Sequence, residues 1–247
     1  MILTVLSQKG GAGKTTTAAA LAQAAAHNGI HTLLIDADPQ CNLSFITGAA
    51  SDAAATIYNV LQGSVTAAEA IRSINKDLGI IQGSAAMQTL SSEQGSGYRL
   101  QQALRPVKKG YRLIIIDTPP QAGEILINCL LAADKALIPV SCDALGAQGL
   151  YAIAGLIKQI QGIQTASKIS VAGFIFTRHS ERTTLSRQLS EDIRAQAENL
   201  GIPYLGSVRD SVKLREAQAL QQDLYSYAGD SNPAKDYNLL LHSILKK

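Results

Sequence analysis

Residues 7–16 read Ser7-Gln8-Lys9-Gly10-Gly11-Ala12-Gly13-Lys14-Thr15-Thr16 and join an apolar run at 2–6 to an Ala-rich segment at 14–28. Glycines let successive backbone N–H groups turn towards an anion, and the start of a helix adds partial positive charge. Lys14 can reach the β- and γ-phosphates of a nucleotide, and the Thr15 hydroxyl can ligate magnesium. Average residue usage gives this pattern a chance frequency on the order of one in ten thousand such chains or less. The stretch predicts a site for a nucleoside triphosphate with Mg2+.

A dinucleotide site is the nearest alternative, because Gly11 and Gly13 precede a helix and Asp36 ends the second apolar run. A dinucleotide fingerprint would place its third glycine at position 16, which is Thr16. It also leaves the Lys14-Thr15 pair without a role. These differences favour ATP over NAD.

Short aliphatic runs alternate with longer helical patterns, which predicts an α/β fold with a doubly wound, mostly parallel sheet flanked by helices. We expect a single domain over 1–247, with irregular segments at 41–95 (loops and short helices) and at 223–233 (a loop). The expected strands are 2–6, 31–35, 78–82, 111–116, 135–140, 169–176 and 202–207. The expected helices are 14–28, 97–107, 123–132, 146–163, 182–199, 212–222 and 233–246.

Composition excludes several classes of protein. The chain has 247 residues, of which 46% are hydrophobic and 17% charged, so it can bury a core and is neither disordered nor fibrous. A net charge of +3 is far below that of a histone-like DNA coat. The three cysteines form no C-x-x-C pair and the four histidines show no ligand spacing, which argues against disulfides and zinc. Without 18 consecutive apolar residues or a signal peptide, we expect a cytoplasmic protein with no stable membrane insertion.

Three aspartates follow predicted strands. Asp117 ends a wholly apolar run, which would hold its carboxylate at the carboxyl edge of the sheet, where it can order magnesium through water. Asp36 and Asp38 flank one residue and would point to the same side of an extended chain. Two carboxylates facing a polyphosphate would repel it unless magnesium or water lay between them.

The loop departs from the usual phosphate-binding pattern, because position 8 is Gln8 instead of glycine and a second lysine, Lys9, follows it. In this form it resembles the deviant Walker A family of ParA and MinD ATPases. The resemblance continues in LLIDADPQ at 33–40, LIIIDTPP at 113–120, and AAD at 132–134 followed by LIPV at 137–140. It spans most of the chain and implies an ATPase that converts ATP and water to ADP and phosphate.

The resemblance also implies residue roles. It makes Asp38 the switch I residue that positions the attacking water, with Asp36 nearer the water shell of a metal held by Thr15 and Asp117. It assigns Lys9, Lys14 and Asp38 to catalysis. Lys9 would cross a dimer interface to the nucleotide of the other subunit, which would explain a second ammonium that burial alone would disfavour. The implied nucleotide-binding residues are Gly10, Gly11, Ala12, Gly13, Lys14, Thr15, Thr16 and, at the adenine, Thr177 and Arg209.

Basic residues concentrate in one part of the chain. Residues 168–215 contain eight basic and five acidic residues, so they hold the whole net charge of +3. Such a surface, doubled in a dimer, could bind DNA phosphates without sequence preference, as ParA-like proteins do. The resemblance therefore implies a homodimer with ATP, association with the nucleoid in that state, and an adaptor of ParB type that stimulates hydrolysis. The alternative is that these are scattered surface arginines on amphipathic helices.

Two other functions remain open. A MinD-like, membrane-associated positioning ATPase would need a basic amphipathic helix, and 237–247 has that character, but the closing helix of the domain should use those positions. A metabolic ligase or kinase, or a relative of the nitrogenase iron protein, would use the same loop. Cys129 and Cys142 lack the glycine-flanked settings of cluster ligands in that relative.

Overall fold

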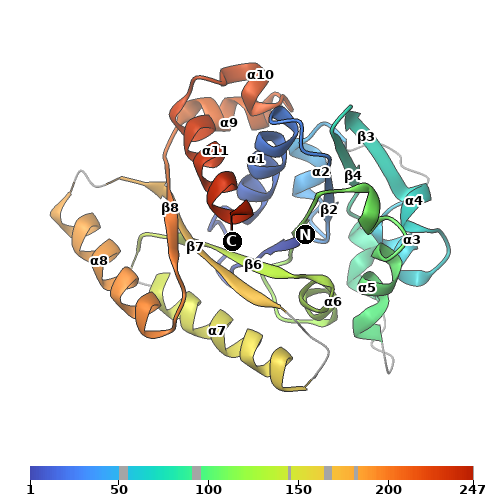
Figure 1. The fold of residues 1–247 in the computed structure, drawn as a ribbon, viewed down its shortest axis with the longest axis horizontal. Coiled ribbons are helices and arrows are strands. Elements are labelled where there is room, and N and C mark those ends of the chain that lie inside the picture. The colour runs from blue at the N-terminus through green and yellow to red at the C-terminus, as the bar shows by residue number, and fades with distance from the viewer. Residues whose placement is uncertain (50–54, 91–95, 144–145, 164–168, 181–182, 247) are drawn as a thin grey trace.

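The computed structural model describes residues 1–49, 55–90, 96–143, 146–163, 169–180 and 183–246, which form one sheet between two layers of helices (Figure 1). Within these residues the sheet has eight strands in the order β3-β4-β2-β5-β1-β6-β7-β8. The strands are β1 Ile2–Val5, β2 Thr32–Asp36, β3 Ile71–Asn75, β4 Leu78–Ile81, β5 Leu113–Asp117, β6 Lys135–Ser141, β7 Ser170–His179 and β8 Tyr204–Arg209. The α-helices are α1 Lys14–His27, α2 Asn42–Ile46, α3 Ile57–Gln62, α4 Ala67–Ala70, α5 Arg99–Leu104, α6 Glu124–Ala132, α7 Gly146–Ile163, α8 Thr184–Asn199, α9 Val212–Ala219, α10 Leu224–Ala228 and α11 Asn232–Leu245.

The central strands are apolar along their whole length because both faces of the sheet are covered. Every residue of β1, β2 and β5 is buried. Alternate strand residues pack into two cores, one beneath α3, α5, α6, α7 and α8 and the other beneath α1, α2, α9, α10 and α11. Figure 1 shows α1, α9, α10 and α11 gathered on one side of the sheet and α7 and α8 on the other. This is the layered arrangement that the sequence predicts.

The seven predicted strands are all present and run parallel, but two elements differ from expectation. The edge strand β3 pairs antiparallel with β4 through a two-residue turn at Lys76 and Asp77. Its three polar residues, Arg72, Ser73 and Asn75, are exposed, so the continuous apolar run that revealed the other strands is absent. The expected loop at 223–233 contains α10, which Asp223 caps: its carboxylate accepts hydrogen bonds from Tyr225 N and Ser226 N at 2.9 Å. An aspartate at this position is a common helix start signal.

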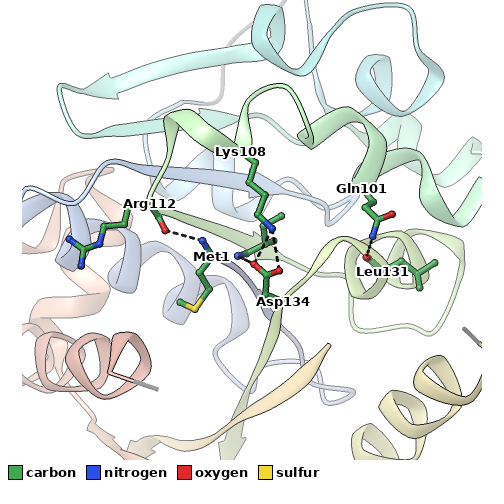
Figure 2. Close-up of polar contacts among 7 residues, drawn as sticks. Met1, Gln101, Lys108, Arg112, Leu131 and Asp134 are labelled. Carbon is green, nitrogen blue, oxygen red and sulfur yellow. Dashed lines mark hydrogen bonds and ion pairs between the residues drawn. The ribbon is translucent and has the colours of Figure 1, made fainter. Parts of the chain in front are cut away.

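The amino edge of the sheet is held by a polar contact between the chain start and the residue that precedes β6 (Figure 2). The Asp134 carboxylate accepts a hydrogen bond from Ile2 N at 2.7 Å and contacts Lys108 Nζ at 3.2 Å. The Met1 ammonium donates to Arg112 O at 3.0 Å. Asp134 therefore fixes the start of β1 against β6.

We expect Asp134→Ala to lower the free energy of unfolding by about 1 to 2 kcal/mol, because the buried Ile2 amide loses its acceptor. Lys108→Ala removes only the half-exposed ion pair and should change the free energy of unfolding by less than about 0.5 kcal/mol. Urea unfolding monitored by circular dichroism measures both. Equal losses for the two variants would contradict the assignment of the stabilisation to the Ile2 hydrogen bond.

Candidate nucleotide site

The glycine-rich loop leaves β1 at the carboxyl edge of the sheet and leads into α1. Gly11 and Gly13 have φ angles of 75° and 86°, which favour glycine, and Gly13 precedes the first turn of α1. No acidic side chain lies in that turn and none caps it. A Cβ on Gly13 would approach Thr177 Cγ2 at 3.2 Å, so a side chain would also crowd this position. The loop thus presents backbone N–H groups and a helix start to an anion.

Lys14 is the first residue of α1 and its side chain is buried. Burial lowers the pKa of Lys14, while the charges of Asp117 and Asp38 oppose this effect. The three side chains come from different segments, α1, the end of β5 and the loop after β2. The lysine predicted to contact phosphates therefore lies beside two of the predicted carboxylates.

Asp117 is the last residue of β5 and neighbours both β1 and β2. It pairs with Val5 in β1 and with Asp36 in β2 in the sheet register. Burial raises its pKa to about 8; the Thr15 hydroxyl opposes the rise, and Asp36 and Asp38 add to it. Neither carboxylate oxygen has a regular hydrogen-bond partner among the residues described. A buried carboxylate of this kind requires a proton or a cation.

Asp36 has a structural connection that the sequence did not suggest. Its Oδ2 accepts hydrogen bonds from Ser44 N at 2.8 Å and Ser44 Oγ at 2.7 Å, and Ser44 Oγ accepts one from Gly83 N at 2.9 Å. Burial raises the pKa of Asp36 to about 6, against the effect of the bonds from Ser44. Asp36 thereby holds α2 to the end of β2, and its place in the water shell of a metal stays a prediction.

Asp38 is buried at the start of the loop after β2. Its Oδ1 accepts a hydrogen bond from Gln40 N at 2.9 Å, and its backbone oxygen accepts one from Cys41 N at 2.9 Å. The Asp38 carboxylate is thus part of a tight turn next to Lys14 and Asp117.

Lys9 forms an ion pair with Asp143, which follows β6 in the same chain. The two side chains are 38% and 39% exposed, so the pair lies at the surface rather than in the core. The structure therefore supplies the charged partner that a second lysine needs. Asp143 was not identified from the sequence, since only the return of β6 beside β1 brings it to the loop.

Thr177 and Arg209 line one small pocket with Gly13 and Thr16. Their polar groups, however, are already bonded within the chain. The Thr177 hydroxyl donates to Ala12 O at 2.9 Å, and the Arg209 guanidinium binds Asp236 of α11, with Nη2 to Oδ1 at 2.6 Å. The pocket lies where the residues predicted for adenine meet, and both side chains hold parts of its wall together. Direct contact of either side chain with the base stays a prediction.

The donor set fits a magnesium ion that is only partly coordinated by protein. Among the residues described there is no group of three or more His, Cys, Asp or Glu side chains suited to a metal. Mg2+ usually keeps waters and binds one or two protein oxygens together with nucleotide phosphates. The Thr15 hydroxyl and the unpartnered Asp117 carboxylate could provide those protein oxygens.

Four of the eight basic residues in the predicted basic surface have partners within the chain. Arg194 stacks on Tyr204, with its guanidinium carbon 4.2 Å from the ring centre. Ion pairs join Arg209 to Asp236, Lys213 to Glu216 and Arg215 to Asp210. Arg178 and Arg187 are exposed, and neither has an ion pair in the part of the chain that the structure covers. Lys168, Arg182 and Glu181 lie outside the described residues.

The closing helix α11 uses its apolar face within the fold. Tyr237, Leu240, Leu241 and Ile244 are buried, and Tyr237 OH lies 3.3 Å from Thr17 Oγ1 of α1. Across the described ranges, none of the helices combines the length and apolar character required to span a bilayer.

Comparisons with known proteins agree with this arrangement. The family model described as an AAA domain matches residues 1–171. The chain is 33% identical over 202 residues to the chromosome partitioning protein ParA of Caulobacter vibrioides, covering 78% of this chain and 75% of that one. It is 32% identical to the chromosome-partitioning ATPase Soj of Treponema pallidum, covering 99% and 97%.

Solved structures share the whole fold. Apo McdA from Cyanothece has a TM-score of 0.88 at 24% identity, covering 99% of this chain and 98% of the other. Cobyrinic acid a,c-diamide synthase from Mycobacterium smegmatis, bound to an ATP analogue and magnesium, has a TM-score of 0.84 at 26% identity, covering 99% and 94%. ATP and Mg2+ are thus ligands of this kind of P-loop protein. The loop, the sheet order and these relatives together place the chain in the ParA/MinD family of deviant Walker A ATPases, as a ParA-type ATPase.

Proposed function

We propose that this ATPase forms a dimer around ATP, binds DNA without sequence preference in that state, and is released when a partner stimulates hydrolysis. Its role would be to segregate or position a plasmid, a chromosome region or another cargo. It would work in the cytoplasm and associate with the nucleoid while ATP is bound. The partner would be an adaptor of ParB type, and the relatives named for chromosome partitioning support this role.

The observation that carries the proposal is the position of Lys9. It lies on the loop but pairs with Asp143 at the surface, whereas Lys14 occupies the buried position beside Asp38 and Asp117. One lysine is thus placed for the nucleotide of its own subunit. The other is half exposed and can exchange Asp143 for a group on a second copy. This division supports a nucleotide that bridges two subunits.

The residues of the site would divide the chemistry as follows. Backbone N–H groups of Gly10 to Thr16 would bind the phosphates, and Lys14 would offset their charge. Thr15 and Asp117 would hold Mg2+, which when bound neutralises charge on the transferred phosphoryl group. Asp38 would orient the attacking water. Phosphoryl transfer depends on such positioning more than on a strong base.

We expect Asp38→Ala to bind ATP and accumulate as a dimer while its turnover falls at least tenfold, because water positioning is lost while Thr15 and Asp117 remain. Phosphate release and light scattering with ATP measure the two effects. Asp192→Ala, at an exposed position on α8, is the matched control. Turnover at the wild-type rate in Asp38→Ala would remove the switch I assignment.

DNA binding is the experiment that tests the proposed function. In a rigid dimer, binding of one basic surface to DNA holds the other basic surface close to the same duplex and so raises its effective concentration. The ATP state should therefore bind a random duplex more tightly than the ADP or nucleotide-free state. Binding should fall steeply with salt. Arg187→Ala, alone and with Arg182→Ala, should weaken binding severalfold and leave dimerisation intact. Lys76→Ala, 90% exposed on the β3–β4 turn, is the control.

Anisotropy of the duplex and sedimentation with anionic liposomes should be measured together with the dimer. An ATP dimer that ignores DNA and sediments with liposomes would replace the proposal with the MinD-like one. A protein that binds neither DNA nor liposomes would indicate a metabolic enzyme. The specific support for that function is the likeness to the diamide synthase structure.

A further inference from the structure

The loop that contains Asp38 is closed at its base by one serine. The loop leaves β2 at Asp36 and ends in α2, which contains Ser44. Ser44 N and Ser44 Oγ both donate to Asp36 Oδ2, at 2.8 Å and 2.7 Å. Two hydrogen bonds from one residue to one carboxylate oxygen thus join the two ends of the loop. Residues 37–43 lie between these ends, with Asp38 near the start.

A glycine from the neighbouring strand completes this base. Gly83 lies two residues beyond β4, which pairs with β2, and its N–H donates to Ser44 Oγ at 2.9 Å. A Cβ on Gly83 would lie 2.9 Å from Cγ and Oδ2 of Asp36 and 3.0 Å from Cys41 Sγ, so this position requires a residue without a side chain. The Ser44 hydroxyl accepts a hydrogen bond from Gly83 and donates one to Asp36, which fixes the direction of its hydrogen.

The Asp36 carboxylate also holds the backbone at Asp38. Its Oδ1 accepts a hydrogen bond from Asp38 N at 3.3 Å, and Ala37, which lies between them, donates its N–H to Asp117 O at 3.0 Å. The Asp38 carboxylate itself accepts a hydrogen bond from Gln40 N, in the same loop. The position of the Asp38 side chain therefore follows the position of the loop, and the base of the loop depends on Ser44.

We propose that Ser44 is a positioning residue for ATP hydrolysis, which holds the loop in the conformation that places the Asp38 carboxylate. The inference rests on the proposed function, because it takes Asp38 as the residue that orients the attacking water. Ser44 acts through Asp36 in this role and need not contact the nucleotide. A displacement of the reacting groups by about 1 Å can slow a reaction up to a hundredfold, whereas the phosphate loop would still bind the nucleotide.

Ser44→Ala is the direct test, because it removes the hydroxyl and keeps the hydrogen bond from the backbone N–H to Asp36. We expect the turnover at saturating ATP to fall about tenfold, while the affinity for ADP and the KM for ATP stay within about twofold of wild type. Phosphate release and titration with a fluorescent ADP analogue measure these quantities. Ser190→Ala is the matched control, since Ser190 of α8 is 3% exposed and Ser44 is 2% exposed, and the Ser190 hydroxyl donates to Arg187 O at 2.8 Å.

Two further variants separate positioning from a general loss of structure. Ser44→Cys fills the same space with a weak hydrogen-bond donor, so it should show the same loss of turnover with nucleotide affinity retained. In the Asp38→Ala protein, adding Ser44→Ala should lower turnover by less than about twofold, because the carboxylate that Ser44 positions is already absent. A tenfold loss in both backgrounds would overturn the proposal, as would wild-type turnover in Ser44→Ala or Ser44→Cys.

The outcomes also distinguish this inference from the proposed function. If Asp38→Ala hydrolyses ATP at the wild-type rate, the role of Asp38 in the proposed function is lost, and the role of Ser44 is lost with it. If Asp38→Ala behaves as expected but Ser44→Ala and Ser44→Cys lose ADP affinity together with turnover, Ser44 only maintains the structure of the site. The proposed function would then stand without the positioning role.

Discussion

Replacing Lys14 with alanine is expected to weaken nucleotide binding about a hundredfold or more, so that no binding is seen at micromolar ADP or ATP. The Lys14 side chain is the buried cation of the site, at the start of α1 beside Asp38 and Asp117. Bonds from an ammonium to phosphate are charge-assisted and stronger than neutral ones, and its loss leaves the polyphosphate beside two carboxylates. Titration with a fluorescent ADP analogue measures the change.

Lys9→Ala is the matched control, since it removes the same charge from the same loop. The Lys9 side chain is paired with Asp143 at the surface, so its loss should leave ADP binding within a few fold of wild type. In light scattering with ATP, however, Lys9→Ala should remain a monomer. A Lys9→Ala protein that dimerises normally would remove the argument for a nucleotide shared between subunits.

The second large effect concerns stability and pH. In the nucleotide-free protein, burial raises the pKa of Asp117 to about 8 from an ordinary value of 3.8. Between these pH values the folded state binds more protons at this group than the unfolded state does, so stability falls as pH rises. The loss is complete once pH exceeds about 8. Asp117→Asn removes the titration, so its stability relative to wild type should increase by a few kcal/mol from about pH 4 to pH 8.

Urea unfolding of both proteins across this range tests the expectation. Asp36, whose pKa burial raises to about 6, contributes a smaller loss between about pH 4 and pH 6, so the change from pH 6 to pH 8 reports on Asp117. Mg2+ with ADP should stabilise wild type at pH 8 more than Asp117→Asn, because the cation favours the ionised carboxylate. A stability difference that does not vary with pH would contradict the buried, unpartnered state of Asp117.

The parallel strands were predictable because their sequences carry a local signal. A strand buried on both faces is continuously apolar, as 113–116 is, whatever its neighbours are. The antiparallel edge strand β3 was missed for the converse reason. It has one partner strand, and three of its five residues are polar and exposed, so its pairing with β4 makes it a strand and its local sequence gives no clear signal.

The site shows the same division. The phosphate loop could be predicted from sequence because adjacent residues on one loop must surround one phosphate group, and the roles of Lys14, Thr15 and the glycines stay predictions. Contacts with Ser44, Asp143 and Asp236 could not, because each joins segments whose proximity depends on the sheet order. Arg209, which the sequence predicts as a nucleotide ligand, is bonded to Asp236 of α11, and its contact with adenine stays a prediction.

By itself, the sequence determined the α/β fold, the phosphate loop and the presence of carboxylates at strand ends, since these follow from periodicity and from spacing within a few residues. Tertiary structure alone decided which charges meet. Asp117 is buried beside Lys14 and Asp36, Asp36 is bonded to Ser44, and Lys9 is paired with Asp143 at the surface. The physical reason is that burial and electrostatic interaction depend on distance in space, and parallel crossovers bring residues more than a hundred positions apart to one edge of the sheet.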